Sequence, residues 1–169
     1  MSLALNFSRS LLFIGVTTAL TSTGFQFDPS DFRVGPIVIG DPIDTVLVHL
    51  GSPGRIDTQS LAGRTLEPDT AFSFYYGGIE VEFEGQRHVR YVILTSSEFA
   101  TARGIRVGDS TSTIQRLYGL PRSDSEPRGE YDPGPNSEWG YSERNSSLSV
   151  IFTCGNGRVK KIFVGWGAC

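Results

Sequence analysis

The clearest pattern in the chain is a strict alternation of apolar and polar residues at positions 79–84. Ile79, Val81 and Phe83 would face one side of a strand there, and three glutamates would face the other. Further short stretches rich in aromatic and β-branched residues predict strands at 71–76, 89–94, 138–142, 148–153 and 159–164. Short turns separate most of them, which indicates antiparallel hairpins, and Asn156-Gly157 is a typical hairpin turn.

Two segments have helical periodicity instead. Apolar residues recur at i, i+3, i+4 and i+7 over residues 43–50, and again at Ile114, Leu117 and Tyr118. Asp41 and Asp109 precede these segments and are predicted to be the N-caps, which accept hydrogen bonds from first-turn N–H groups. A Gly-x-Pro sequence then ends each predicted helix.

The helical segments belong to a longer internal repeat. Residues 37–53 and 105–121 align without gaps at an offset of 68. Identical pairs in this window include Gly40/Gly108, Asp41/Asp109, Thr45/Thr113, Gly51/Gly119 and Pro53/Pro121. The duplication predicts an α+β fold in which two tandem helix-loop-β-meander repeats form one antiparallel sheet, with both helices on one face. The expected units are residues 25–100 and 101–169, packed as one domain.

The first hairpin can be given an expected register. A three-residue turn at 85–87 places Phe83 beside Val89 and Val81 beside Tyr91 on the apolar face. The opposite face of the sheet is then polar and open to solvent. Long Gly-, Pro- and Ser-rich connections at 52–70 and 121–137 are expected to be either functional loops or plain surface.

The amino terminus has the order of a secretory signal peptide. Arg9 is followed by an apolar run over 11–20 and by small residues up to Gly24. The run is shorter than the roughly 20 residues that span a bilayer. We therefore predict a signal peptide at 1–24, a secreted or periplasmic location, and no membrane span once it is removed. A buried N-terminal helix is the alternative.

Composition and charge exclude several classes of function. The 169 residues carry a formal net charge of −3, so no basic field is present to attract nucleic acid. With 2 His and 2 Cys, neither a His-rich catalytic centre nor a four-Cys zinc site is expected. Glu80, Glu82 and Glu84 have the chemistry for a divalent cation, but a solvated acidic face explains them better. We expect no metal, no cofactor and no enzymatic activity.

The two cysteines are Cys154 and Cys169. In an oxidising compartment they are expected to form a disulfide. The chain would have to turn back at 165–167, because a straight strand would carry Cys169 about 33 Å away. Two free thiols or an intermolecular bond are the alternatives.

Several short motifs together resemble a known unit. They are the Gly-Asp-(Ser/Pro) start of each helix, the Gly-x-Pro that follows, the aromatic strand at 139–141 and the hairpin sequence at 156–159. The pattern resembles the SmpA/OmlA (BamE) unit, and its tandem form resembles the beta-lactamase inhibitor protein family. The resemblance covers about residues 35–165. It implies a secreted or outer-membrane-associated protein that binds other proteins and has no catalytic residues.

The expected function is therefore that of a non-catalytic protein-binding module. Its binding surface is predicted to be the open sheet face together with the long loops. The candidate binding residues are Tyr75, Glu80, Glu82, Arg90 and Trp139, since aromatic and arginine side chains dominate protein interfaces. Two narrower roles stay open, an inhibitor or immunity protein against a secreted hydrolase and a structural component of envelope assembly. The partner is another protein, which the sequence does not identify.

Overall fold

The computed structural model of this protein describes residues 27–60, 70–85, 87–121, 133–142 and 147–167. The predicted signal peptide and Cys169 lie outside these ranges, as do residues 61–69 and 122–132 of the two long connections. The elements are η1 (Pro29–Phe32), β1 (Arg33–Val34), β2 (Ile37–Val38), α1 (Ile43–Leu50), β3 (Arg55–Ser60), β4 (Thr70–Tyr75), β5 (Ile79–Glu84), β6 (His88–Leu94), α2 (Thr111–Tyr118), β7 (Glu138–Ser142), β8 (Leu148–Gly155) and β9 (Arg158–Trp166).

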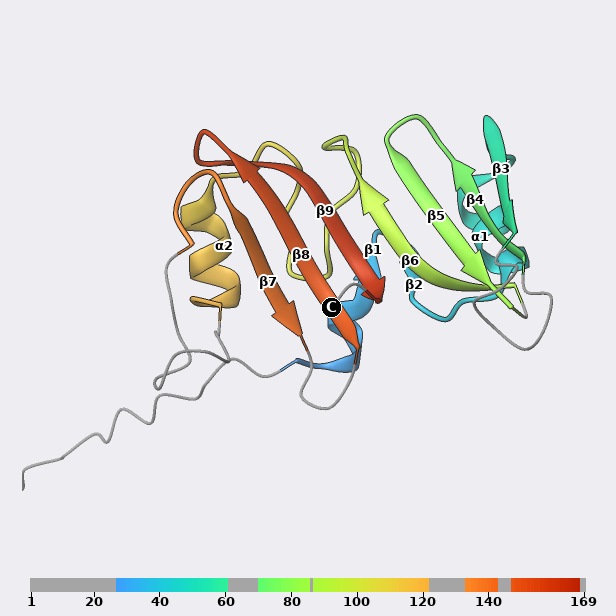
Figure 1. Ribbon diagram of the computed structural model, residues 1–169, viewed down its shortest axis with the longest axis horizontal. Coiled ribbons are helices and arrows are strands. Elements are labelled where there is room, and N and C mark those ends of the chain that lie inside the picture. Colours follow the sequence, from blue (N-terminus) through green and yellow to red (C-terminus); the bar gives the residue numbers. More distant parts are fainter. Residues whose placement is uncertain (1–26, 61–69, 86, 122–132, 143–146, 168–169) are drawn as a thin grey trace, which may run out of the picture.

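Seven strands form one antiparallel sheet in the order β3-β4-β5-β6-β9-β8-β7 (Figure 1). Strands β1 and β2 form a separate two-stranded sheet. The fold is therefore α+β with a large antiparallel sheet, as the sequence predicts. Among the described residues no helix is long and apolar enough to cross a membrane, and each α-helix has 8 residues.

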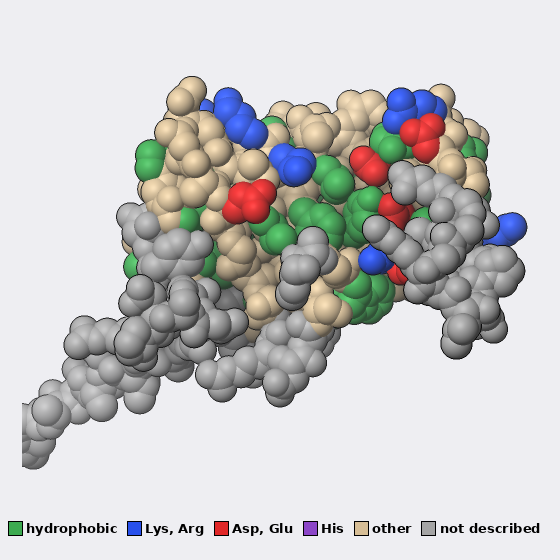
Figure 2. All heavy atoms as spheres, in the orientation of Figure 1, with side chains coloured by type: hydrophobic (Ala, Val, Ile, Leu, Met, Phe, Trp, Pro, Cys, Tyr) green, Lys and Arg blue, Asp and Glu red, His purple; other side chains and the backbone are tan. Residues whose placement is uncertain are grey.

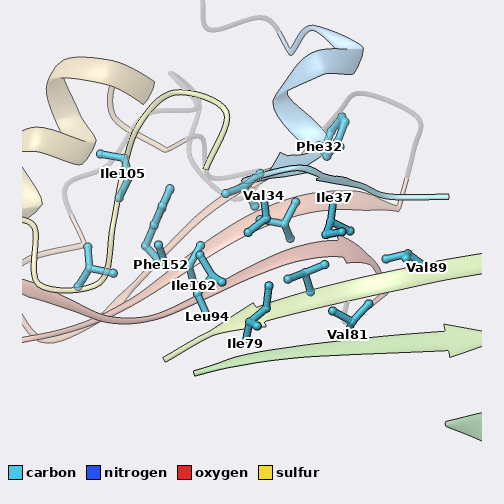
Figure 3. Packing of buried hydrophobic residues seen from close by; sticks show 14 of the residues in the cluster. Phe32, Val34, Ile37, Ile79, Val81, Val89, Leu94, Ile105, Phe152 and Ile162 are labelled. Carbon is cyan, nitrogen blue, oxygen red and sulfur yellow. The ribbon is translucent and has the colours of Figure 1, made fainter. Parts of the chain in front are cut away.

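The apolar face of the sheet is covered by η1, β1, β2 and the helices. In Figure 3, Phe32, Val34 and Ile37 lie over inward-facing residues of the sheet such as Leu94 and Ile162. These residues are between 0 and 4% exposed. They form one continuous core, so the segment before α1 is part of the packed fold.

Both helices contribute to this same core. Val46 of α1 and Ile114 and Tyr118 of α2 are completely buried in it. The ring of Tyr118 lies 5.1 Å from those of Tyr141 and Phe152, which point inward from β7 and β8. Among the residues that the structure describes, no helix lies on the opposite face of the sheet, in agreement with the expectation that the helices share one face.

The same hydrogen bonds hold each helix to its neighbouring hairpin. The Gly40 N–H donates to the carbonyl of Val89 at 2.8 Å, and the Val89 N–H donates to the carbonyl of Asp41 at 2.8 Å. Gly108, Asp109 and Val159 make the identical pair of bonds, both again 2.8 Å long. The start of each helix is thus fixed to the beginning of the strand that returns from a hairpin.

The ends of the helices are held in a matching way. The Tyr76 hydroxyl donates to the carbonyl of Gly51 at 3.3 Å, and the Tyr141 hydroxyl donates to that of Gly119 at 2.8 Å. Both glycines have positive φ, 75° and 77°, which ends the helix as predicted.

The predicted N-caps are wrong by one residue. The structure places Pro42 and Ser110 at the N-cap positions, and the Ser110 side chain accepts from the Thr113 N–H. Asp41 and Asp109 instead accept hydrogen bonds of 2.8 Å from backbone N–H groups three residues earlier in the chain. The aspartates therefore close the turn that leads into each helix.

The predicted register of the first hairpin is correct only near its turn. Phe83 pairs with Val89 as expected, but Val81 pairs with Val92, because a β-bulge shifts the register between Glu82 and Phe83. Val89 and Val92 both point inward and are an odd number of residues apart, so an extra residue must be accommodated between them. The bulge turns Tyr91 to the open face of the sheet.

The segment before α1 is tied to the loop before α2. Asp31 is 4% exposed and forms a two-pronged ion pair with Arg103, with both N–O distances 2.6 Å. The same guanidinium donates to the carbonyl of Leu117 at 3.0 Å and lies over the ring of Tyr118. Gly35 adds a backbone bond of 2.9 Å to Ala100.

Candidate binding face

The candidate site is the sheet surface opposite α1 and α2, and we call it the open face. Cross-strand pairing arranges its side chains in rows that run across the sheet. The central row contains Arg55, Tyr75, Glu80, Ile93, Phe163, Ile151 and Gly140, one residue from each strand. Residues 57, 73, 82, 91, 165, 149 and 142 form the next row.

The middle of the open face is apolar. Tyr91, Ile93, Phe163 and Ile151 are each partly exposed there, and we call these four residues the apolar patch. Figure 2 shows hydrophobic side chains gathered over the middle of the sheet, with acidic and basic side chains to either side. The rings of Tyr91 and Phe163 lie 5.3 Å apart, which joins β6 to β9 across the patch.

A glycine opposite Tyr91 makes this arrangement possible. A Cβ atom on Gly165 would lie 2.4 Å from the Cβ of Tyr91 and 2.5 Å from the carbonyl oxygen of Arg90. Its φ of 154° is also one that other residues rarely adopt. A disulfide between Cys154 and Cys169 would require the chain to turn back at 165–167, whereas β9 continues to Trp166.

Glu82 is held in a small polar network beside the patch. The Tyr91 hydroxyl donates to its carboxylate at 2.5 Å, and the Arg90 guanidinium lies 3.5 Å from it. Burial, and then the hydrogen bond and charge of Glu82, raise the pKa of Tyr91 well above its usual value. Arg90 also pairs with Glu84 at 3.0 Å, so a single arginine serves both carboxylates.

Other charges on the open face have no such partner among the described residues. Within the described ranges, neither Glu80 nor Lys161 forms an ion pair or a side-chain hydrogen bond. Glu80 pairs across the strands with Ile93, and Lys161 lies two residues before Phe163 on β9. An acid and a base therefore flank the apolar patch with their charges available.

The structure places four of the five predicted binding residues on the open face. Tyr75, Glu80, Glu82 and Arg90 lie there, although Glu82 is only 7% exposed. Trp139 does not: it pairs with Phe152, points into the core and is 3% exposed. The alternation of residues along a strand predicts which residues share a face with Trp139, but not which of the two faces of the sheet that is.

The predicted disulfide is not supported. Cys154 is a free thiol, 8% exposed and directed into the core near the second hairpin. Burial raises its pKa to about 11. Its predicted partner, Cys169, lies outside the described residues.

No group of three or more His, Cys, Asp or Glu side chains in the described part of the chain is arranged to hold a metal ion. The three glutamates of β5 are instead divided by their contacts, since Arg90 pairs with Glu82 and Glu84 but not with Glu80.

Comparison with known proteins gives a similarity of fold. No protein-family model matches the chain, and no curated protein matches its sequence. An extracellular protein containing a SCP domain from Bacillus anthracis aligns with 75% of this chain at a TM-score of 0.53 and 12% identity. A cysteine-rich secretory protein from Staphylococcus aureus aligns with 76% of it at a TM-score of 0.46 and 8% identity. The match covers 43% and 44% of those two chains, so this chain spans less than half of their length.

The uncharacterized protein yfeY from Escherichia coli aligns with 80% of this chain and 97% of its own, at a TM-score of 0.46 and 15% identity. The expected resemblance to the BamE unit and to the beta-lactamase inhibitor protein family is wrong. The similar structure with a TM-score of 0.53 is described as a protein containing a SCP domain. At these identities the likeness concerns the fold alone.

Proposed function

We propose that this protein is a non-catalytic module that binds another protein through the open face. The observation that carries the proposal is the apolar patch at the centre of the sheet surface opposite the two helices. Contiguous exposed apolar groups rimmed by charges are typical of protein interaction sites. Tyr91 and the nearby Tyr75 and Arg90 add the residue types that dominate binding energy at interfaces.

We further propose that the sheet arose from two tandem helix-loop-β-meander units, at about residues 25–100 and 101–169. Support comes from the paired contacts at Gly40 and Gly108 and at Tyr76 and Tyr141. On this proposal the apolar patch lies where the two units meet. A surface of this kind is absent from either unit alone, because β6 and β9 both contribute to it.

A secreted or periplasmic location follows from the predicted signal peptide at 1–24. The similar structure from Bacillus anthracis is described as an extracellular protein, which agrees with that location. Two narrower roles fit such a module, inhibition of a secreted hydrolase or a contribution to envelope assembly. A single tightly bound hydrolase would favour the first role, and a large membrane complex the second.

The test is affinity capture from envelope extract with a matched pair of variants. Ile93→Arg places a charge in the apolar patch, and we expect it to abolish capture. Val48→Arg places the same charge on α1, where the native side chain is 82% exposed, and it should capture as the native protein does. Retention of the partner by folded Ile93→Arg would exclude the open face.

A further inference from the structure

We infer that Asn156 is a site of spontaneous deamidation, and that residues 133–137 control the rate by holding the turn between β8 and β9. Asn156-Gly157 is the only Asn-Gly pair in the sequence. In such a pair the backbone nitrogen of the glycine can attack the side-chain amide of the asparagine, because the glycine has no side chain to hinder the approach. The reaction needs no enzyme and is independent of what the open face binds.

The reaction has two steps. The Gly157 nitrogen forms a bond to Cγ of Asn156, and the bond from Cγ to the amide nitrogen breaks. The proton of the Gly157 N–H leaves with that amide nitrogen as ammonia. Water then opens the five-membered succinimide ring at either carbonyl, which gives aspartate or isoaspartate at position 156. Asn156 is exposed, so water reaches the ring.

The turn is held in the folded protein by hydrogen bonds to residues 133–137, which we call the clasp. The Gly157 N–H, which must lose its proton, donates to the carbonyl of Pro135 at 3.0 Å. The Asn156 N–H donates to Oδ1 of Asn136 at 2.6 Å. The attacking nitrogen is therefore engaged, and its bond to Pro135 must open before the ring can close.

The backbone conformation of the turn also opposes ring closure. Asn156 and Gly157 have φ values of 54° and 69°, and the residues on either side of them pair with each other. These are the features of a two-residue hairpin turn with both central residues in the left-handed region. Ring closure needs Cβ of Asn156 to lie in the peptide plane beside the Gly157 nitrogen. The backbone must leave the turn conformation to reach that arrangement.

The clasp is itself anchored to the fold. The carbonyl of Ser137 accepts from the Cys154 N–H at 3.0 Å, and the Ser137 hydroxyl donates to the carbonyl of Gly134 at 2.9 Å. The indole N–H of Trp139, a core residue, donates to the same Gly134 carbonyl at 3.1 Å. Opening of the clasp is therefore a local unfolding event, and its equilibrium sets the rate of deamidation.

Deamidation would change the surface at this end of the open face. Both products carry a carboxylate close to Arg158 and Lys160, which are exposed. Isoaspartate also adds one carbon atom to the backbone of a two-residue turn, so the pairing of Gly155 with Arg158 would be lost.

The experiment is a time course of the purified protein at mildly alkaline pH, in which mass spectrometry of its peptides measures conversion at position 156. The native protein should deamidate at least about tenfold more slowly than a synthetic peptide of residues 153–160. The protein unfolded in urea should reach the rate of the peptide. Asn156→Gln should show no conversion at this position, since glutamine cannot form the five-membered ring.

Two variants of Asn136 test the clasp. Asn136→Ala removes the acceptor of the Asn156 N–H and should raise the rate about fivefold. Asn136→Asp keeps an acceptor oxygen at the same place and should deamidate as the native protein does. Asn136 is exposed, so both variants are expected to fold.

Three results would overturn the inference. They are a folded native protein that deamidates as fast as the peptide, a rate in Asn136→Ala equal to the native rate, and an unfolded protein that shows no conversion at Asn156. The first two would show that the clasp does not control the reaction, and the third that Asn156 is not its site.

Discussion

Ile93 on β6 lies directly opposite Phe163 on β9, 70 residues further along the chain. The pairs on either side are symmetric about this point, with Val92 opposite Val164 and Leu94 opposite Ile162. Val89 and Val159 are also 70 residues apart, and each makes the same pair of backbone hydrogen bonds with the Gly-Asp sequence that precedes a helix. Strands β6 and β9 therefore join the N-terminal and C-terminal parts of the sheet, and the exposed residues where they meet form the centre of the open face.

Gly165 is expected to be essential for this meeting of β6 and β9. Gly165→Ala should lower the free energy of unfolding by about 3 kcal/mol, because its Cβ would collide with Tyr91 and its φ would be strained. Urea denaturation followed by circular dichroism measures the effect.

Gly140 provides the matched control for that substitution. It lies on the same face of the sheet, and a Cβ there meets no atom within 4 Å. Gly140→Ala should change stability by no more than about 0.5 kcal/mol. Equal effects at the two positions would show that the close approach at Tyr91 is not what constrains Gly165.

Asp31 and Arg103 should act as one unit in stabilising the fold. Asp31→Ala and Arg103→Ala should each cost about 3 kcal/mol, because each leaves a charged partner without its counter-ion in a largely buried site. The double variant should be more stable than the sum of the two losses predicts, with a coupling energy of at least about 1 kcal/mol. Thermal or urea unfolding of the four proteins completes the cycle.

Arg55 and Asp57 form the comparison pair at 3.0 Å, with side chains that are 62% and 45% exposed. Arg55→Ala should cost less than about 1 kcal/mol. Additive losses at Asp31 and Arg103 would contradict the coupling.

The hydroxyl of Tyr91 should stabilise the protein through Glu82. Tyr91→Phe removes the 2.5 Å hydrogen bond to a carboxylate that is 7% exposed, and should cost about 1 to 2 kcal/mol. Tyr75→Phe removes a hydroxyl on the same face that makes no hydrogen bond within the described chain, and should be nearly neutral. Charge reversal at Glu82 is expected to destabilise the fold for the same reason, so Glu80 is the better position for testing binding.

Cys154 should make stability decline at alkaline pH. Its folded pKa of about 11 lies above the ordinary value of 9.0, so the folded state holds the proton that the unfolded state releases. The stabilisation is complete below about pH 9 and is lost as pH rises towards 11. The free energies of unfolding of the native protein and of Cys154→Ala, measured across this pH range, should approach each other as the pH increases.

The same burial should make the Cys154 thiol unreactive. In a Cys169→Ser background, a thiol reagent should modify Cys154 only after unfolding. Rapid modification of the folded protein would contradict the buried position.

Periodicity in the sequence located both helices and six strands, but it could not locate β3. The sequence of Arg55–Ser60 has one large apolar residue, Ile56, which is 56% exposed. An edge strand with polar groups on both faces has no apolar side to reveal it. Its pairing with β4 becomes evident only in the folded sheet.

The candidate site was predicted in part for a similar reason. Alternation on β5 correctly placed Glu80 and Glu82 on the polar face, whereas Trp139 was assigned to the surface although it points into the core. The bulge that turns Tyr91 outward depends on contacts between strands, which no single strand encodes. Phe163, Ile93 and Ile151 could have been found as the apolar residues that alternate with the core positions of their strands.

The route of the chain before α1 has a consequence for any attempt to divide the molecule. Residues 29–34 precede the strands of one half but contact the other, where η1 packs against β8, Asp31 pairs with Arg103 and Val34 pairs with Thr101. Proteolytic cleavage between β6 and α2 would therefore leave two fragments that stay associated and co-purify. Neither fragment would complete its own hydrophobic interior when expressed by itself.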